Sequence, residues 1–129
     1  MEKLILIVED EPSNMKLFRD LLKIGGYPTI EATDGQRGVK LARERKPGLI
    51  LMDVNMPVMD GCEATRILKS DASTKHIPIV AVTSCVMKSE IEEILRAGCD
   101  DYLVKPIDIK DFLNKVAQYL PGTAPITGL

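Results

Sequence analysis

The chain is predicted to fold as an α/β domain, a doubly wound sheet of five parallel strands with helices on both faces. Short apolar runs alternate with longer segments whose apolar residues recur at helical spacing. The runs are unbroken, which is typical of strands covered on both faces. At 129 residues the chain suits one domain. We expect that domain to span residues 1–120, with the Pro-, Gly- and Thr-rich residues 121–129 as a loose tail.

The first strand and helix occupy the first quarter of the chain. Leu4 to Val8 is a fully apolar strand. The helix begins at about Pro12, a residue suited to a first helical turn, and stops at Gly25-Gly26. The residues expected to face the core are Leu17, Phe18, Leu21, Leu22 and Ile24, with Met15 at the edge of the stripe.

The middle of the chain continues the alternation of strand and helix. Thr29 to Ala32 is a weaker strand, and Asp34-Gly35 predicts a turn before a short helix that ends at Lys46-Pro47. Leu49 to Asp53 is the third strand. A turn-rich loop and a helix through Ile67 follow it.

The last two strands complete the predicted sheet. The fourth runs from Ile79 to Thr83, and its helix closes at Ala97-Gly98 because glycine is the usual left-handed stop. The fifth, Tyr102 to Val104, precedes a last helix from about Ile109 to Leu120. Right-handed crossovers and short connections leave few topologies, and the strand order 2-1-3-4-5 is the simplest that places strands one and three side by side.

Composition argues against several classes of function. No apolar run approaches the roughly 20 residues that span a bilayer, and Met1-Glu2-Lys3 leads straight into a strand, so we expect a cytoplasmic protein without membrane contact. The formal net charge of -2 and the scattered basic residues argue against nucleic-acid binding. The three cysteines lack a CxxC pair, and His76 is the only histidine, which argues against a zinc site.

Acidic, hydroxyl and basic side chains stand at the carboxyl ends of four predicted strands. They are Glu9 and Asp10, Asp53, Thr83 and Lys105. Because the carboxyl ends of parallel strands share one edge of a sheet, these side chains should meet in one crevice. Each alone has a simpler explanation: a turn former or helix cap for the aspartates, an N-cap for the threonine and a solvated charge for the lysine. Those separate explanations account poorly for the occurrence of such residues at the ends of all four strands.

Three carboxylates at one point repel each other, by about 4 kcal/mol for two charges about 4 Å apart at an effective dielectric near 20. Lys105 offsets part of this repulsion and a divalent cation the rest. Oxygen-only ligands favour Mg²⁺, with Mn²⁺ able to substitute. Asp10 and Asp53 are the predicted carboxylate ligands, and Glu9 acts through a bound water.

The same residues suit phosphoryl transfer. Asp53 would be the nucleophile that gives an acyl phosphate, while the Lys105 ammonium and the Thr83 hydroxyl hold phosphoryl oxygens. A cis peptide bond before Pro106 would aim the lysine inward.

At these positions the chain resembles the receiver domain of two-component response regulators, from residue 3 to about 120. The matching motifs are Glu9-Asp10-Glu11, Asp53 with Met56-Pro57 and Asp60-Gly61, Thr83-Ser84, and Lys105-Pro106. The resemblance implies a flavodoxin-like fold and phosphorylation of Asp53 by a histidine kinase or a histidine phosphotransfer protein. It also implies Mg²⁺ bound by Asp10, Asp53 and the main-chain carbonyl of Asn55. The family is a phosphoacceptor with slow self-hydrolysis rather than an enzyme that turns over substrate.

The resemblance further implies a switch. The Thr83 hydroxyl moves toward the phosphoryl group and Tyr102 turns inward, so that helix four, strand five and helix five bind a downstream signalling protein. The residues that tune phosphoryl lifetime fall at Asn55 and Cys85. The stretches around the first and fourth strands are similar to stand-alone regulators of bacterial cell division and polarity.

Several alternatives stay open or are disfavoured. The same pattern occurs in receivers cut from hybrid histidine kinases or multidomain regulators, and a non-phosphorylated interaction module would normally lack the acceptor or the lysine. A haloacid-dehalogenase-type phosphatase needs a second aspartate where this chain has Asn55. A flavin carrier is disfavoured because Glu9, Asp10 and Glu11 would repel its phosphate. Met15 is the residue expected to contact the phosphodonor.

Overall fold

The computed structural model describes residues 3–56, 59–84 and 87–120, and within them the chain forms one parallel sheet in the order β2-β1-β3-β4-β5. The predicted fold class and strand order are confirmed. The strands are β1 (Ile5–Val8), β2 (Thr29–Ala32), β3 (Leu49–Asp53), β4 (Ile79–Thr83) and β5 (Asp101–Val104). The helices between and after them are α1 (Pro12–Ile24), α2 (Gly35–Arg45), α3 (Gly61–Ser70), α4 (Lys88–Arg96) and α5 (Ile109–Tyr119).

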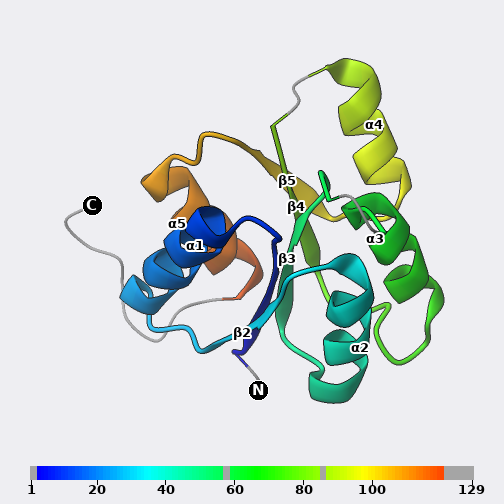
Figure 1. Ribbon diagram of the computed structural model, residues 1–129, viewed down its shortest axis with the longest axis horizontal. Helices are drawn as coiled ribbons and strands as arrows, with labels where there is room; N and C mark the ends of the chain where they lie inside the picture. The colour runs from blue at the N-terminus through cyan, green and yellow to red at the C-terminus, as the bar shows by residue number, and fades with distance from the viewer. Residues whose placement is uncertain (1–2, 57–58, 85–86, 121–129) are drawn as a thin grey trace.

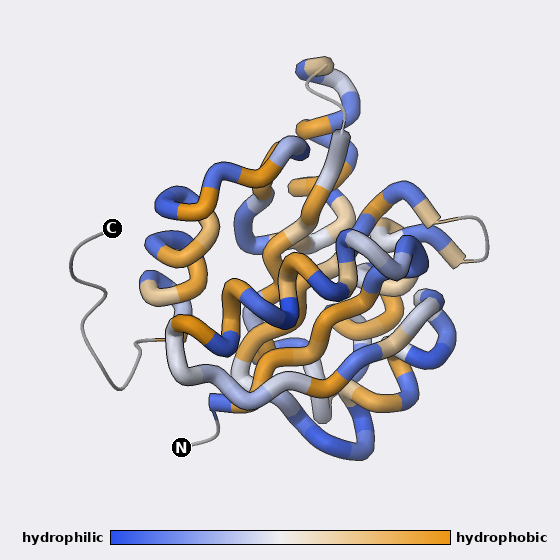
Figure 2. The backbone as a smooth tube through the Cα atoms, turned by 60° about the vertical axis from the view of Figure 1, so that its left-hand side comes forward, coloured by the Kyte–Doolittle hydropathy of each residue, from blue (hydrophilic) through white to orange (hydrophobic). Residues whose placement is uncertain are grey.

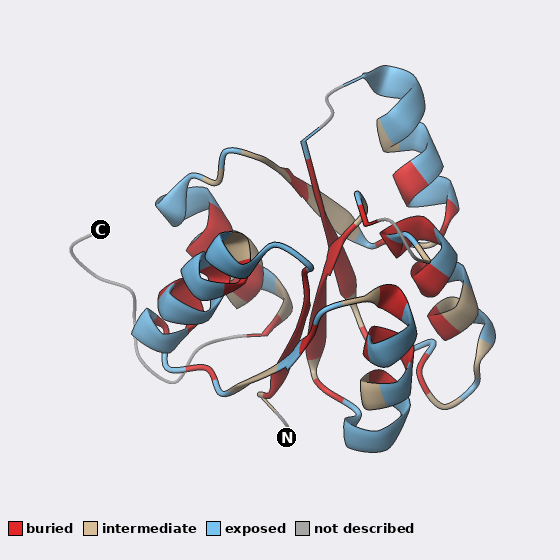
Figure 3. Ribbon diagram, viewed as in Figure 1, coloured by how far each residue is buried: buried red, intermediate tan, exposed pale blue. Residues whose placement is uncertain are grey.

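The helices form a layer on each face of the sheet. Figure 1 shows α1 and α5 on one side and α2, α3 and α4 on the other. Figure 2 shows hydrophobic residues gathered along the strands and recurring along the inner faces of the helices. The strands of the sheet interior are buried along their whole length (Figure 3), whereas only Ala32 is buried in the edge strand β2. The second strand lies where predicted, and it is less buried than the interior strands because it has a neighbouring strand, β1, on one side only.

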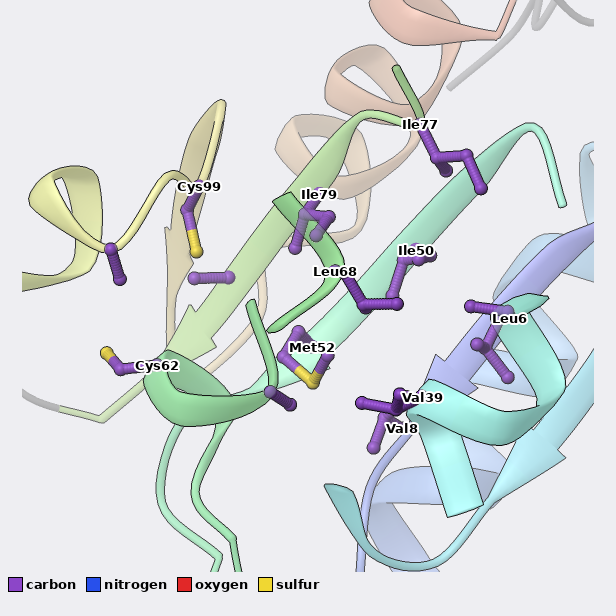
Figure 4. Close-up of a cluster of buried hydrophobic side chains, with 14 of the residues drawn as sticks. Leu6, Val8, Val39, Ile50, Met52, Cys62, Leu68, Ile77, Ile79 and Cys99 are labelled. Atoms are coloured by element: carbon purple, nitrogen blue, oxygen red, sulfur yellow. The ribbon is translucent and has the colours of Figure 1, made fainter. Parts of the chain in front are cut away.

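Successive side chains of each strand point to opposite faces of the sheet, so the strands contribute to two separate hydrophobic cores. Leu6 and Val8 face α2, α3 and α4 (Figure 4), while Ile5 and Ile7 face α1 and α5. On the second side the Phe18 and Phe112 rings stack, with centroids 5.6 Å apart and planes 6° apart. On the first side Cys62 and Cys99 are buried free thiols, which confirms them as packing residues, and Cys85 lies outside the described residues.

The predicted core stripe of α1 is partly wrong. Leu17 and Ile24 are 41% and 65% exposed, whereas Met15 is only 5% exposed. A helix turns about 100° per residue, so Leu17 lies on a different side from Met15 and Phe18, and Ile24 lies at the open end of the helix. Met15 packs in the α1/α5 core, so the structure favours a packing role over the predicted contact with a phosphodonor.

The predicted element bounds hold to within one residue, apart from the length of α2. The first strand begins at Ile5 rather than Leu4, the fifth at Asp101 rather than Tyr102, and α5 ends at Tyr119 rather than Leu120. The expectation that α2 is short was wrong, because it has 11 residues, as many as α5. Few apolar residues are needed to hold it, since Gly38 lets its backbone approach Val8 closely. None of the described helices is long and apolar enough to cross a membrane.

Candidate functional site

The carboxyl edge of the sheet brings the predicted site residues together. Glu9 follows β1 and Asp53 ends β3, and the pairing of Val8 with Met52 sets these two carboxylates side by side. Thr83 ends β4 opposite Val104, and Lys105 is the next residue. Carboxylate oxygens of Glu9, Asp10 and Asp53 all lie within 4.8 Å of one another.

Asp53 is buried at the end of its strand, with 2% of the residue exposed. Its Oδ1 accepts a hydrogen bond from the backbone N–H of Asn55 at 2.9 Å. The simpler explanation of Asp53 as a turn former is therefore true of the local backbone. It does not explain why the carboxylate is also buried beside two further acids, because burying a charge costs free energy unless the charge is compensated.

Glu9 is the most completely buried acid of the site, at 1% exposure. Its Oε2 accepts from the backbone N–H of Glu11 at 3.1 Å, whereas its buried Oε1 has no hydrogen bond within the described residues. Loss of solvent raises the pKa of Glu9 to about 7, and the charge of Asp53 adds to the rise; the Glu11 N–H and Lys105 oppose it. An extra positive charge at this point would favour the ionised form.

Lys105 points into the crevice rather than into solvent. Its Nζ lies 3.6 Å from Glu9 Oε1 and 3.8 Å from Asp53 Oδ1, and 22% of its side chain is exposed. The peptide bond between Lys105 and Pro106 is cis. The interpretation of Lys105 as an ordinary solvated charge does not fit this position.

Asp10 differs from its neighbour Glu9 in being exposed. It does not cap α1, because the N-cap is Glu11, whose side chain accepts from the backbone N–H of Ser13 at 2.8 Å. Asp10 is therefore available on the solvent side of the carboxylate cluster.

The cluster fits a hard divalent cation. Mg²⁺ binds oxygens at about 2.0–2.1 Å, so two ligands on opposite sides stand about 4 Å apart, and a more distant group acts through water. The 4.8 Å limit on the cluster agrees with that arrangement. Glu9 Oε1, which has an ion pair with Lys105 but no hydrogen bond within the described residues, is an acceptor that a metal-bound water would satisfy. The three carboxylates carry up to three negative charges, and the Lys105 ammonium balances one of them. Up to two negative charges therefore remain for a cation to balance.

Thr83 lies at the carboxyl end of β4, and Tyr102 lies on the neighbouring strand β5, opposite Ala81. Thr83 is buried at 1% and does not cap α4, whose N-cap is Met87. Asn55 and Thr83 line a cavity of about 280 Å³ that α4 borders. Tyr102 is half-buried and packs against the core under α2, α3 and α4.

One contact near the site was not predicted. The side-chain Oδ1 of Asn55 lies 3.4 Å from both the backbone N and the Oγ of Ser84, so the loops after β3 and β4 meet across the crevice. The sequence signal was the place of Ser84 directly after a strand-end threonine. Cys85, the other position expected to tune phosphoryl lifetime, and Pro57 of the β3–α3 loop lie outside the described residues.

Comparison with known proteins assigns this geometry to a family. A profile of the response regulator receiver domain matches residues 5–117. The chain belongs to that family. Receiver domains of this family act in two-component signalling. This receiver is 46% identical over 120 residues to the polar-differentiation response regulator DivK of Brucella anthropi. It is also 46% identical over 120 residues to the DivK of Brucella melitensis. These alignments cover 93% of this chain and 98% of each relative, which confirms the predicted similarity to polarity regulators.

Solved structures agree with the receiver fold. The chemotaxis protein CheY4 of Vibrio cholerae superposes with a TM-score of 0.87 at 28% identity, over 93% of this receiver and all of that chain. The receiver domain of a sensor histidine kinase from Pseudomonas aeruginosa gives a TM-score of 0.86 at 32% identity, over 93% and 98% of the two chains. That Pseudomonas structure has a magnesium ion coordinated in its active-site cleft.

The raised pKa of Glu9 predicts a pH-dependent stability of the metal-free receiver. Between the ordinary value of 4.5 and about 7, the folded state holds a proton that the unfolded state has lost, so stability falls as pH rises. The loss attributable to Glu9 is about 3 kcal/mol at most. Glu9→Gln should remove it and leave a flatter profile.

Urea denaturation in EDTA at several pH values between about 5 and 8 checks this prediction. Wild type minus Glu9→Gln isolates the Glu9 contribution, because other titrating groups are common to both. Parallel profiles for the two proteins would show that the carboxyl is not held protonated by burial.

Proposed function

We propose that this receiver accepts a phosphoryl group on Asp53, in a Mg²⁺-dependent reaction, from a phosphohistidine of a histidine kinase or a histidine phosphotransfer protein. The observation that carries the proposal is the buried Asp53 carboxylate, with the Lys105 ammonium at 3.8 Å and the Glu9 and Asp10 oxygens within 4.8 Å. This arrangement supports a nucleophile, a cation site and a fixed positive charge at one point.

The proposed reaction uses Asp53 as the nucleophile. A carboxylate oxygen attacks phosphorus, the bond from phosphorus to the donor imidazole nitrogen breaks, and its electron pair stays on that nitrogen. The Lys105 ammonium holds one phosphoryl oxygen, and the Thr83 hydroxyl turns toward another. Asp10, Asp53 and the main-chain carbonyl of Asn55 would hold Mg²⁺, with Glu9 acting through water. A Mg²⁺ ion held there, or Mn²⁺ in its place, would supply positive charge beside the transferred group.

The product is stored rather than released rapidly. A phosphatase with an aspartate nucleophile needs a general acid two residues later, and Asn55 supplies none. We therefore infer that self-dephosphorylation is slow and that the receiver acts as a signal carrier, not as an enzyme with turnover.

The proposed output is a change in the face formed by α4, β5 and α5. Movement of Thr83 toward the phosphoryl group would draw Tyr102 inward, and a downstream signalling protein would bind the altered face. Three exposed apolar side chains support a docking role, namely Met87 at the N-cap of α4, Leu95 on α4 and Ile109 on α5.

The wider setting is also part of the proposal. We assign residues 1–120 to the receiver domain and expect 121–129 to be a loose tail, in the cytoplasm and without nucleic-acid or membrane partners. A receiver of a hybrid histidine kinase is a second candidate, favoured by the 32% identity to the receiver domain of the Pseudomonas sensor kinase.

Intact-mass measurement after incubation with a small phosphodonor tests the proposal. With Mg²⁺ the receiver should gain one phosphoryl group, which hydroxylamine removes because it is an acyl phosphate. With EDTA no gain is expected. An unchanged mass for folded protein, with a donor that phosphorylates another receiver, would instead favour the interaction module.

A further inference from the structure

Helices α2 and α3 lie side by side on the face of the sheet away from α1 and α5 (Figures 1 and 3). Residues of both helices line a groove. A cavity of about 800 Å³ and a second of about 500 Å³ meet at Arg43 and Ile67, which line both. The apolar wall is made by Val39, Met59 and Ile67, all packed on the core under these helices. The groove is therefore wide enough for a ligand with apolar side chains.

The wall contributed by Met59 is held closely against α2. A Cβ at Gly35 would lie 2.3 Å from the carbonyl oxygen of Met59, so only glycine allows this approach. Met59 itself has a left-handed φ of 52°. The end of the groove is thus shaped by backbone contacts rather than by movable side chains.

The rim of the groove is positively charged in a chain whose net charge is -2. Helix α2 carries four cations and one acid, a net charge of +3. The cations that line the two cavities are Arg37, Lys40, Arg43 and Arg66, and the acids that line them are Glu44 and Asp71. Four cations and two acids give the lining a net charge of +2, at a place where the groove is also apolar.

The existing ion pairs of the rim leave these cations available to a ligand. Arg37 pairs with Asp34 at 3.7 Å, and Arg66 with Glu93 at 3.8 Å, both with exposed arginine side chains. Such pairs contribute little stability and exchange readily. Lys40 has no ion pair within 4 Å among the described residues. Arg43 is the exception, because it lies 2.8 Å from Asp71. Hydrogen bonds from the backbone N–H and the hydroxyl of Ser73, and then the Arg43 contact, lower the pKa of that carboxyl to about 2.

We propose that the α2/α3 groove binds an acidic amphipathic helix of a partner protein. Apolar side chains at i, i+3, i+4 and i+7 of such a helix span about 10 Å, and Arg37 to Arg43 of α2 spans about 9 Å. In the proposed complex, the apolar side chains of the partner helix contact Val39, Met59 and Ile67. The carboxylates of the partner helix on either side of them face Arg37, Lys40 and Arg66. This surface is separate from the α4–β5–α5 face and needs no phosphoryl group.

A designed peptide of about 14 residues tests this, with Leu at i, i+3, i+4 and i+7 and Glu at most other positions. Titrated into the isotope-labelled 129-residue chain, it should shift the amide signals of residues around Lys40, Arg43 and Ile67. Lys40→Glu should weaken binding by about fivefold or more, and Arg45→Glu, a matched charge reversal on the same helix outside the cavities, by less than about twofold. Both positions are exposed, so both variants should fold.

Two further peptides separate the outcomes. Replacing Leu by Ser, or Glu by Lys, should each abolish the shifts in the groove. Equal binding by the Ser peptide, equal weakening by the two variants, or shifts confined to α4 and α5 would overturn the proposal. So would self-association of the chain, lost in Lys40→Glu, because the groove would then hold the acidic α4 of a second copy.

Discussion

Asp53→Asn is expected to lower phosphoryl uptake from a small donor at least about 100-fold, because an amide lacks the anionic oxygen that attacks phosphorus. The substitution keeps the shape of a side chain that is only 2% exposed. It also keeps an oxygen that can accept the Asn55 N–H. The variant should therefore fold while losing its chemistry.

Intact mass with Mg²⁺ and donor gives the measurement, with circular dichroism to verify folding. Asp108→Asn is the matched control, because it removes a carboxylate at the N-cap of α5, where Asn caps as well as Asp. Its uptake should equal that of the wild type. Uptake by Asp53→Asn at the wild-type level would place the acceptor on another residue.

Phe112→Ala is expected to lower the free energy of unfolding by about 3–5 kcal/mol, the largest stability effect that we predict. The ring is fully buried on α5 and stacks on Phe18 of α1, so its removal leaves a cavity between both helices and the sheet. Domains of this size are stable by about 5–15 kcal/mol, so the variant would lose a large share of that margin.

Urea denaturation followed by circular dichroism measures this loss. Ile109→Ala on the same helix is the control, since Ile109 is 49% exposed and the change should cost only about 0.5 kcal/mol. A similar loss for the two variants would mean that the core under α1 and α5 is not packed around the phenylalanine pair.

Much of the fold was predictable because the parallel sheet is covered on both faces. Strands such as Ile79–Thr83 are then unbroken apolar runs up to their last residue, which separates them from the helices without any knowledge of their neighbours. The candidate site was predictable for a related reason. Parallel strands end at one edge, so Asp53, Thr83 and Lys105 come together whatever the details of packing.

The errors lie where periodicity alone cannot decide burial. Leu17 and Met15 are both apolar, yet only Met15 contacts the core, because α5 and the sheet cover one side of α1. The length of α2 was underestimated for the converse reason. Its close approach to β1 depends on Gly38, a residue with no side chain to reveal a buried position.

The amino-acid sequence alone determined the α/β fold class, because apolar runs alternate with segments of helical period. It also determined that acidic residues lie at one edge of the sheet, because they directly follow the parallel strands. Tertiary packing decided which acid carries the cost of burial: Glu9 is enclosed and its pKa is raised to about 7, while the adjacent Asp10 remains in solvent. It also brought α2 against α3 to form the basic groove. Solvent exclusion depends on what distant segments place over a side chain, and a sequence pattern records only the direction in which that side chain points.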